Sequence, residues 1–167
     1  MTKQTIIFLI ITLLPVFVFS QEIIREDGKY YNEDGELYSG TTKEYYESGE
    51  LKAEIKVEDG VLDGESIFYF KDGNKKEIRS YKNGKMHGTW ITWNEEKTKV
   101  ALANYKKGKK HGVWKIWDEK GTIRFKMKYK KGKKAGTWYN YNDKGELVSK
   151  RNFGEENKDK TKDKNNQ

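Results

Sequence analysis

The chain has 167 residues and a formal net charge of +8 at pH 7; 36% of its residues are charged and 34% are hydrophobic. This polar composition does not favour a deep globular core, whereas the 14% of aromatic residues favours a thin, elongated array with ring contacts between neighbouring units. The absence of cysteine excludes disulfides, thiolate metal sites and a cysteine nucleophile.

The first twenty residues are of a different kind from the rest. Lys3 is followed by an apolar run over residues 6–19, and Val18 and Ser20 suit the −3 and −1 positions of a cleavage site. The pattern predicts a secretory signal peptide over residues 1–20 and an exported protein, whether periplasmic, cell-surface or secreted. The alternative is a membrane anchor, but the run is shorter than the roughly 17–25 residues of a spanning helix. We therefore expect no membrane span after signal cleavage.

Glycine recurs every 24 residues along the chain, in three interleaved series. The first series is Gly40, Gly64, Gly88, Gly112 and Gly136; the second is Gly60, Gly84, Gly108 and Gly132; the third is Gly49, Gly73, Gly121 and Gly145, with Lys97 as its one gap. This periodicity predicts a tandem array over residues 40–154. Its five units are 40–63, 64–87, 88–111, 112–135 and a shortened 136–154. Residues 21–39 are predicted to be a partial repeat that caps the array, and residues 155–167 a disordered polar tail.

Each unit is predicted to contain two β-strands. The second strand alternates apolar and charged residues with period two, as in residues 51–58 and 123–130, which is typical of a half-buried strand. The first strand is short and aromatic, as in residues 90–93 and 114–117. Short connections between strands then predict an all-β fold: an elongated, single-layer antiparallel meander of 24-residue hairpins with no helix.

The conformational freedom of glycine and its missing side chain also predict features of the turns and strand starts. The second and third series fit hairpin turns, since glycine accepts a positive φ. With Lys97 in place of glycine, we expect a looser turn in the third unit. The first series is expected to admit a neighbouring ring or backbone where it approaches closely.

Residues at equal offsets should stack in rows, and two aromatic rows are the predicted core. The rows are Tyr45, Tyr69, Trp93, Trp117 and Tyr141, and Val57, Tyr81, Tyr105, Tyr129 and Phe153.

Two stretches, residues 81–88 and 105–112, share the pattern Tyr-Lys-x-Gly-Lys-x-His-Gly, and a Gly-x-Trp motif opens the aromatic strands. This combination is similar to the MORN repeat (membrane occupation and recognition nexus), and looks most like the bacterial MORN repeat variant or YwqK-family antitoxin module. The resemblance covers about residues 28–154. It implies a single-layer array of β-hairpins used for scaffolding, protein contacts or lipid contact. The first unit departs from the pattern, with Thr42 for tryptophan and Asp63 for histidine.

No residue pattern predicts catalysis, a metal site or a cofactor. His87 and His111 are the only histidines, and equivalent positions one unit apart lie about 10 Å apart by strand spacing, too far to share a zinc ion. No serine or threonine lies in a nucleophile motif. We therefore expect no enzyme activity.

Charge is unevenly distributed along the chain. Residues 21–63 carry a net charge of −8 and residues 64–135 a net charge of +14. Alternation predicts that four cations of the fourth unit share one face: Arg124, Lys126, Lys128 and Lys130. Such a face is either a solvated surface or a contact for lipid headgroups, an acidic glycan or an acidic protein. The acidic first unit of a second copy would give head-to-tail association, whereas nucleic acid is not favoured because exported proteins seldom meet it.

The tryptophans predict either an internal ladder or a stacking platform for sugars or choline-like groups. The residues concerned are Trp90, Trp93, Trp114, Trp117, Trp138 and Tyr141. Trp90 and Trp93 are three residues apart, so a regular strand places them on opposite faces unless a bulge intervenes. The sequence favours a non-catalytic interaction or scaffold protein with an unidentified protein partner. The alternatives are a carbohydrate- or cell-wall-binding module and an antitoxin-like partner-binding protein.

Overall fold

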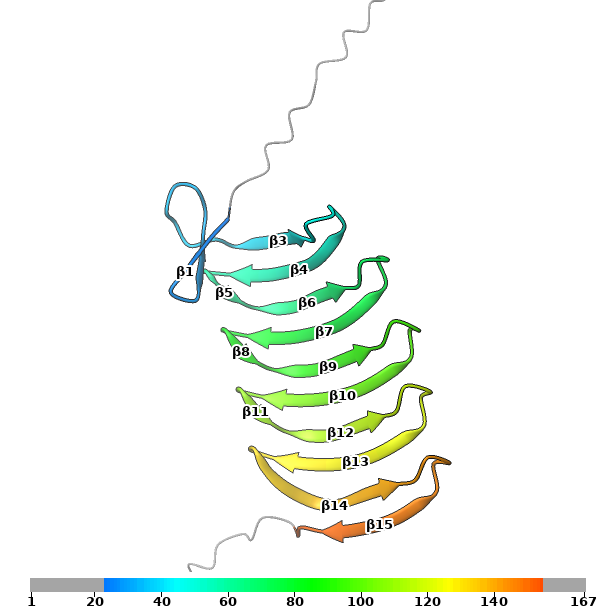
Figure 1. Ribbon diagram of the computed structural model, residues 1–167. Helices are drawn as coiled ribbons and strands as arrows, with labels where there is room; N and C mark the ends of the chain where they lie inside the picture. The colour runs from blue at the N-terminus through cyan, green and yellow to red at the C-terminus, as the bar shows by residue number, and fades with distance from the viewer. Residues whose placement is uncertain (1–22, 155–167) are drawn as a thin grey trace, which may run out of the picture.

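The computed structural model describes residues 23–154, which form fifteen β-strands and no helix (Figure 1). The strands are β1 (Ile24–Glu26), β2 (Lys29–Tyr31), β3 (Gly40–Tyr45), β4 (Leu51–Glu58), β5 (Val61–Leu62), β6 (Gly64–Tyr69), β7 (Lys75–Lys82), β8 (Lys85–Met86), β9 (Gly88–Trp93), β10 (Lys99–Lys106), β11 (Lys109–Lys110), β12 (Gly112–Trp117), β13 (Ile123–Lys130), β14 (Lys133–Tyr141) and β15 (Leu147–Asn152). The predicted signal peptide and polar tail lie outside the described residues. Within residues 23–154 no helix is long and apolar enough to cross a membrane.

The strands from β3 onward form one antiparallel sheet of thirteen strands, with neighbours in chain order (Figure 1). The short strands β5, β8 and β11 lengthen the connections between units and pair with β4, β7 and β10. A separate two-stranded sheet, β1 with β2, lies across the first end of the array. The predicted all-β, single-layer meander is confirmed.

The turn within each unit has the same hydrogen-bond pattern whether or not it contains glycine. In the second unit Gly73 N–H donates to the Phe70 carbonyl at 3.0 Å, and in the third Lys97 N–H donates to the Asn94 carbonyl at 3.1 Å. Lys97 adopts a φ of 63° to do so. The expected looser turn is therefore wrong: the third unit keeps the turn and places a lysine in a left-handed conformation that costs about 1–2 kcal/mol.

Every glycine of the first series has a positive φ, and three of them also have a close neighbour described below. At Gly40 the neighbour is the Tyr38 ring, as expected. At Gly64 (φ 92°) and Gly88 (φ 81°) it is instead the side chain of Lys56 or Ser80 on the preceding strand, so the expected ring or backbone is wrong there. A Cβ on Gly64 would lie 2.7 Å from the Lys56 Cδ atom, but that flexible side chain can move away. The φ of 92°, which residues with a Cβ rarely adopt, explains why this strand opens on glycine.

A β-bulge recurs on the second strand of each unit, one residue from its beginning. In the third unit Trp93 pairs with Lys99 and Thr92 with Ala101, so Val100 is the extra residue. The bulge lies on β10, and β9 itself alternates regularly, which leaves Trp90 and Trp93 on opposite faces. We call the face that carries Trp90 the ladder face, and the other the opposite face.

The buried core is small and lies at the first end of the array. Ala53, Ile55 and Val57 of β4 are at most 5% exposed, and Tyr30 of β2 packs on them. The expectation that two aromatic rows form the core is wrong in part. The rings of the row that contains Val57 are joined only through tryptophans that belong to neither predicted row, as described below, and Tyr45 in the other row is 58% exposed. A single-layer sheet has no second layer to cover that row.

Candidate functional site

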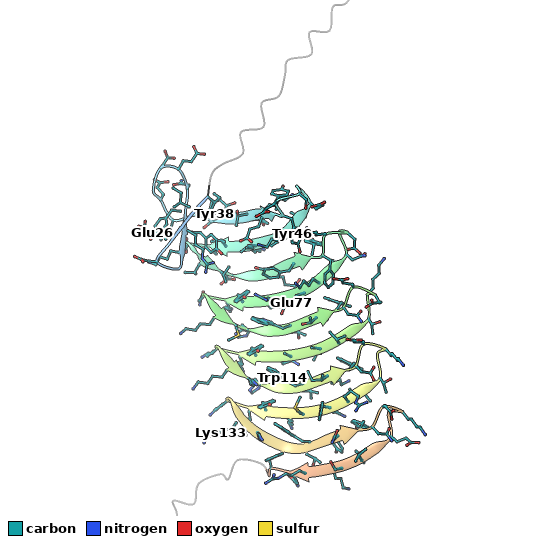
Figure 2. All side chains as sticks on the ribbon, in the orientation of Figure 1. Glu26, Tyr38, Tyr46, Glu77, Trp114 and Lys133 are labelled. Atoms are coloured by element: carbon teal, nitrogen blue, oxygen red, sulfur yellow. The ribbon has the colours of Figure 1, made fainter. Side chains whose placement is uncertain are left out.

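An unbroken ladder of aromatic rings runs along the ladder face from the second unit to the last. Successive ring centroids lie 4.8–5.5 Å apart, in the order Tyr81, Trp90, Tyr105, Trp114, Tyr129, Trp138 and Phe153. Figure 2 shows Trp114 near the middle of the array. All seven residues are half-buried, and burial raises the pKa of the Tyr105 and Tyr129 hydroxyls. Each ring is thus packed by its neighbours and still open on the outer side of the sheet.

Each tryptophan of the ladder is held by a hydrogen bond that the sequence analysis missed. The indole Nε1–H of Trp90, Trp114 and Trp138 donates at 2.9 Å to the backbone carbonyl of the residue ten positions earlier. The acceptors are Ser80, Asn104 and Lys128. The tryptophan of each Gly-x-Trp motif therefore fixes its strand to the preceding one where the β-pairing is irregular. The sequence signal for this hydrogen bond is the recurrence of the Gly-x-Trp motif itself.

Cations lie over the rings of the ladder. The Lys110 Nζ atom is 4.6 Å from the Trp114 ring centroid, and Lys134, its equivalent in the next unit, is 4.7 Å from that of Trp138. Both lysines are exposed. Such contacts contribute about 0.5–1 kcal/mol at exposed sites.

Arg79 of β7 also lies over aromatic rings of the ladder face, in the second unit. Its guanidinium lies 4.3 Å from the Phe68 ring centroid and donates to Glu77 at 2.7 Å. The Glu77 carboxylate raises the pKa of Arg79, so this cation is already paired.

The ladder face also has a shallow hollow near the last strands, with a volume of about 170 Å³. Its lining includes Phe125, Met127, Trp138, Arg151 and Phe153. In the part of the chain that the structure describes, no three histidine, cysteine, aspartate or glutamate side chains are placed to hold a metal ion. The hollow therefore offers aromatic walls and one guanidinium.

The opposite face carries a cross-strand row that continues through ten strands. Its members, each opposite the next, are Lys43, Glu54, Ile67, Ile78, Ile91, Leu102, Lys115, Lys126, Tyr139 and Lys150. The row begins with a Lys43–Glu54 ion pair at 3.6 Å, is aliphatic in the middle and becomes basic at the end. Trp93, Trp117 and Tyr141 lie on this face too, away from the ladder.

The regular register places three of the four cations predicted to share a face. Lys126, Lys128 and Lys130 lie on the opposite face, beside Lys115. The bulge interrupts the alternation at Arg124, whose guanidinium lies 3.9 Å from the Asp118 carboxylate. The placement of Arg124 on the same face stays a prediction, because the bulge removes it from the regular alternation that places the other three.

The two histidines occupy equivalent positions in successive units. The backbone N–H of His87 donates to the Ser80 carbonyl, and that of His111 to the Asn104 carbonyl. Each lies just before the glycine that opens an aromatic strand, and each backbone contact belongs to the repeat itself.

The geometry defines a class of protein: an open, single-layer array of antiparallel β-hairpins that repeats at the interval of the glycine series. The family model of the MORN repeat variant matches residues 38–59, 62–83 and 110–131. The chain thus contains MORN repeat variants, at positions separated by one and by two repeat periods. A comparison with curated proteins gives no match. The resemblance to the YwqK-family antitoxin module stays a prediction.

Proposed function

We propose that the protein is a non-catalytic, exported interaction or scaffold module that contacts an anionic partner surface through the basic end of its opposite face. The observation that carries the proposal is the cluster of Lys115, Lys126, Lys128 and Lys150 on neighbouring strands of one uncovered face. Like charges opposite each other destabilise a sheet, so mixed signs would serve folding better. The first unit has such mixed signs in its Lys43–Glu54 pair.

The test compares binding to anionic and neutral lipid vesicles and to a heparin-like polymer. Near a charged membrane each cation contributes about 1 kcal/mol, so Lys126→Gln with Lys128→Gln should weaken binding roughly thirtyfold at low salt. The matched control is Lys43→Gln with Lys56→Gln in the acidic first unit, which removes the same charge. Elution of the wild type and the Lys126/Lys128 variant at the same low salt would mean that the basic cluster is only a solvated surface.

Export rests on the short apolar run and the residues that precede Gln21, and it has a separate test. N-terminal sequencing of the protein from cells should find a start near Gln21. A start at Met1 or Thr2 would contradict cleavage and export together.

A further inference from the structure

A segment of the chain itself already covers part of the ladder face. Residues 23–38, which we call the cap, place Tyr30 on Ala53, Ile55 and Val57, and leave Tyr30 only 6% exposed. Ile23 and Tyr38 pack against the same cluster. Figure 2 shows Tyr38 at the first end of the array. The ladder face of the first unit is therefore built to accept a polypeptide segment.

The cap is also tied to the array by its backbone. Tyr30 N–H donates to the Gly60 carbonyl at 2.9 Å, in the turn between the first and second units. The equivalent turns hold Gly84, Gly108 and Gly132, which all have a left-handed φ, between 69° and 89°. Within residues 23–154 no backbone N–H reaches the carbonyls of these three glycines. Later units thus repeat the backbone acceptor that the cap uses, with no segment of the described chain bound to it.

The uncovered part of the ladder face is complementary in charge to the cap. The cap has five carboxylates and two cations, a net charge of −3. From β7 to β15 the register places one carboxylate on the ladder face, Glu77, and it is bound to Arg79. Lys110, Lys134 and Arg151 lie over the rings of the later units. A segment with the charge of the cap would meet cations along this stretch.

The hollow near the last strands provides room for a ring. A cavity of about 150 Å³ can hold benzene, and the hollow has a volume of about 170 Å³ between Phe125, Met127, Trp138 and Phe153. Arg151 at its edge suits a hydroxyl or carboxylate. A tyrosine beside acidic residues, as in the cap, matches this lining.

We propose that the ladder face from β9 to β15 binds an acidic, tyrosine-bearing, extended segment of another protein, as the cap is bound on the first unit. The proposal rests on the proposed function as an interaction module and names a face and a partner chemistry. It concerns Lys110 and Lys134, whereas the anionic surface proposed above concerns Lys126 and Lys128 on the other side of the sheet. Either proposal can fail without the other.

The probe is a synthetic peptide with the sequence of residues 23–38, titrated into the protein while tryptophan fluorescence is measured. All five tryptophans lie in β9, β12 and β14, so exchange of the peptide with the cap on the first unit would not produce the signal. We expect a saturable fluorescence change that weakens with salt, because exposed charges are screened. A peptide whose five carboxylates are replaced by amides should bind roughly fivefold or more weakly.

Two double variants of equal charge separate the faces. Lys110→Gln with Lys134→Gln should weaken peptide binding roughly fivefold, while Lys126→Gln with Lys128→Gln should change it less than about twofold. Lys110→Arg with Lys134→Arg should retain binding, which shows that the cations matter and not a loss of folding. Far-ultraviolet circular dichroism checks that all variants keep their β-structure.

Three results would overturn the proposal. The first is no saturable change with the peptide, or equal weakening by both glutamine pairs. The second is a fluorescence change with neutral oligosaccharides and none with the peptide, which would make the ladder a glycan platform. The third is self-association of the protein that Lys110→Gln with Lys134→Gln abolishes, which would make the occupant a second copy.

Discussion

Replacing Trp114 by phenylalanine removes one hydrogen-bond donor from the aromatic ladder and keeps a ring in place. The indole N–H donates to the Asn104 carbonyl at 2.9 Å, and the ring lies 5.1 Å from Tyr105 and 5.3 Å from Tyr129. The Asn104 carbonyl retains the His111 N–H at 2.8 Å, so the substitution does not leave this acceptor without a partner. The change therefore isolates one hydrogen bond and a modest loss of buried area.

The expected loss can be estimated from these contacts. One neutral hydrogen bond contributes about 1 kcal/mol, and some 40 Å² of lost apolar burial adds about 1 kcal/mol. We expect Trp114→Phe to lower the free energy of unfolding by about 2 kcal/mol. The control is Trp117→Phe in the same strand: its side chain lies on the opposite face and makes no ring contact within residues 23–154. It should cost less than about 1 kcal/mol.

Urea unfolding followed by far-ultraviolet circular dichroism measures the difference. Arrays of repeats can unfold unit by unit, so the slope of the transition must be compared together with its midpoint. Equal losses in the two variants, or a larger loss in Trp117→Phe, would refute the role assigned to the indole hydrogen bond and the ladder.

The remaining predictions concern the turns, the tyrosines and a buried hydroxyl. Lys97→Gly should raise the free energy of unfolding by about 0.5–1 kcal/mol in urea, because glycine accepts the φ of 63° at a smaller cost than lysine; a decrease would contradict the assigned strain. Burial raises the pKa of Tyr105 and Tyr129 above 10.0, so the unfolded chain releases these protons first and stability should fall as pH rises above about 10. Replacing both tyrosines by phenylalanine should flatten that fall, and an unchanged pH profile would exclude them as its source. Ser66 is 1% exposed and its hydroxyl has no hydrogen-bond partner among the described residues, so Ser66→Ala should stabilise by about 1 kcal/mol. Ser80→Ala should destabilise by a similar amount, because that hydroxyl donates to a backbone carbonyl at 2.9 Å; thermal unfolding that gave both variants the same sign would contradict this assignment.

The features that could be predicted from the sequence are those that depend on one short segment at a time. Alternation over residues 51–58 specifies a half-buried strand without knowledge of its neighbours, and β4 covers those residues. Turn glycines act in the same local way, since a positive φ is a property of one residue. Because the units repeat at a fixed interval, a strand or turn assigned in one unit applies to the equivalent residues of the others. The all-β meander could therefore be predicted from few observations.

Features that involve two strands could not be predicted in the same way. The bulge at Arg124 depends on how β13 pairs with β12, and it breaks an alternation that looks complete in the sequence. The indole hydrogen bonds join residues of adjacent strands, and only the structure shows that Trp114 reaches the Asn104 carbonyl. For the same reason the sequence did not reveal that Trp90, Trp114 and Trp138 would join the rings of one predicted row into a ladder.

The start of the ladder at Tyr81 follows from what covers the first unit. Thr42 and Ser66 occupy the positions that tryptophan holds in the later units, and Ser66 is buried beside the cluster on which the cap packs. An indole at either position would have to fit into a region that the Tyr30 ring already fills, since Tyr30 is only 6% exposed. The departures from the repeat pattern in the first two units therefore fit the presence of the cap. Where tryptophan begins, the face is open, and the same aromatic positions become a surface on which a second polypeptide can lie.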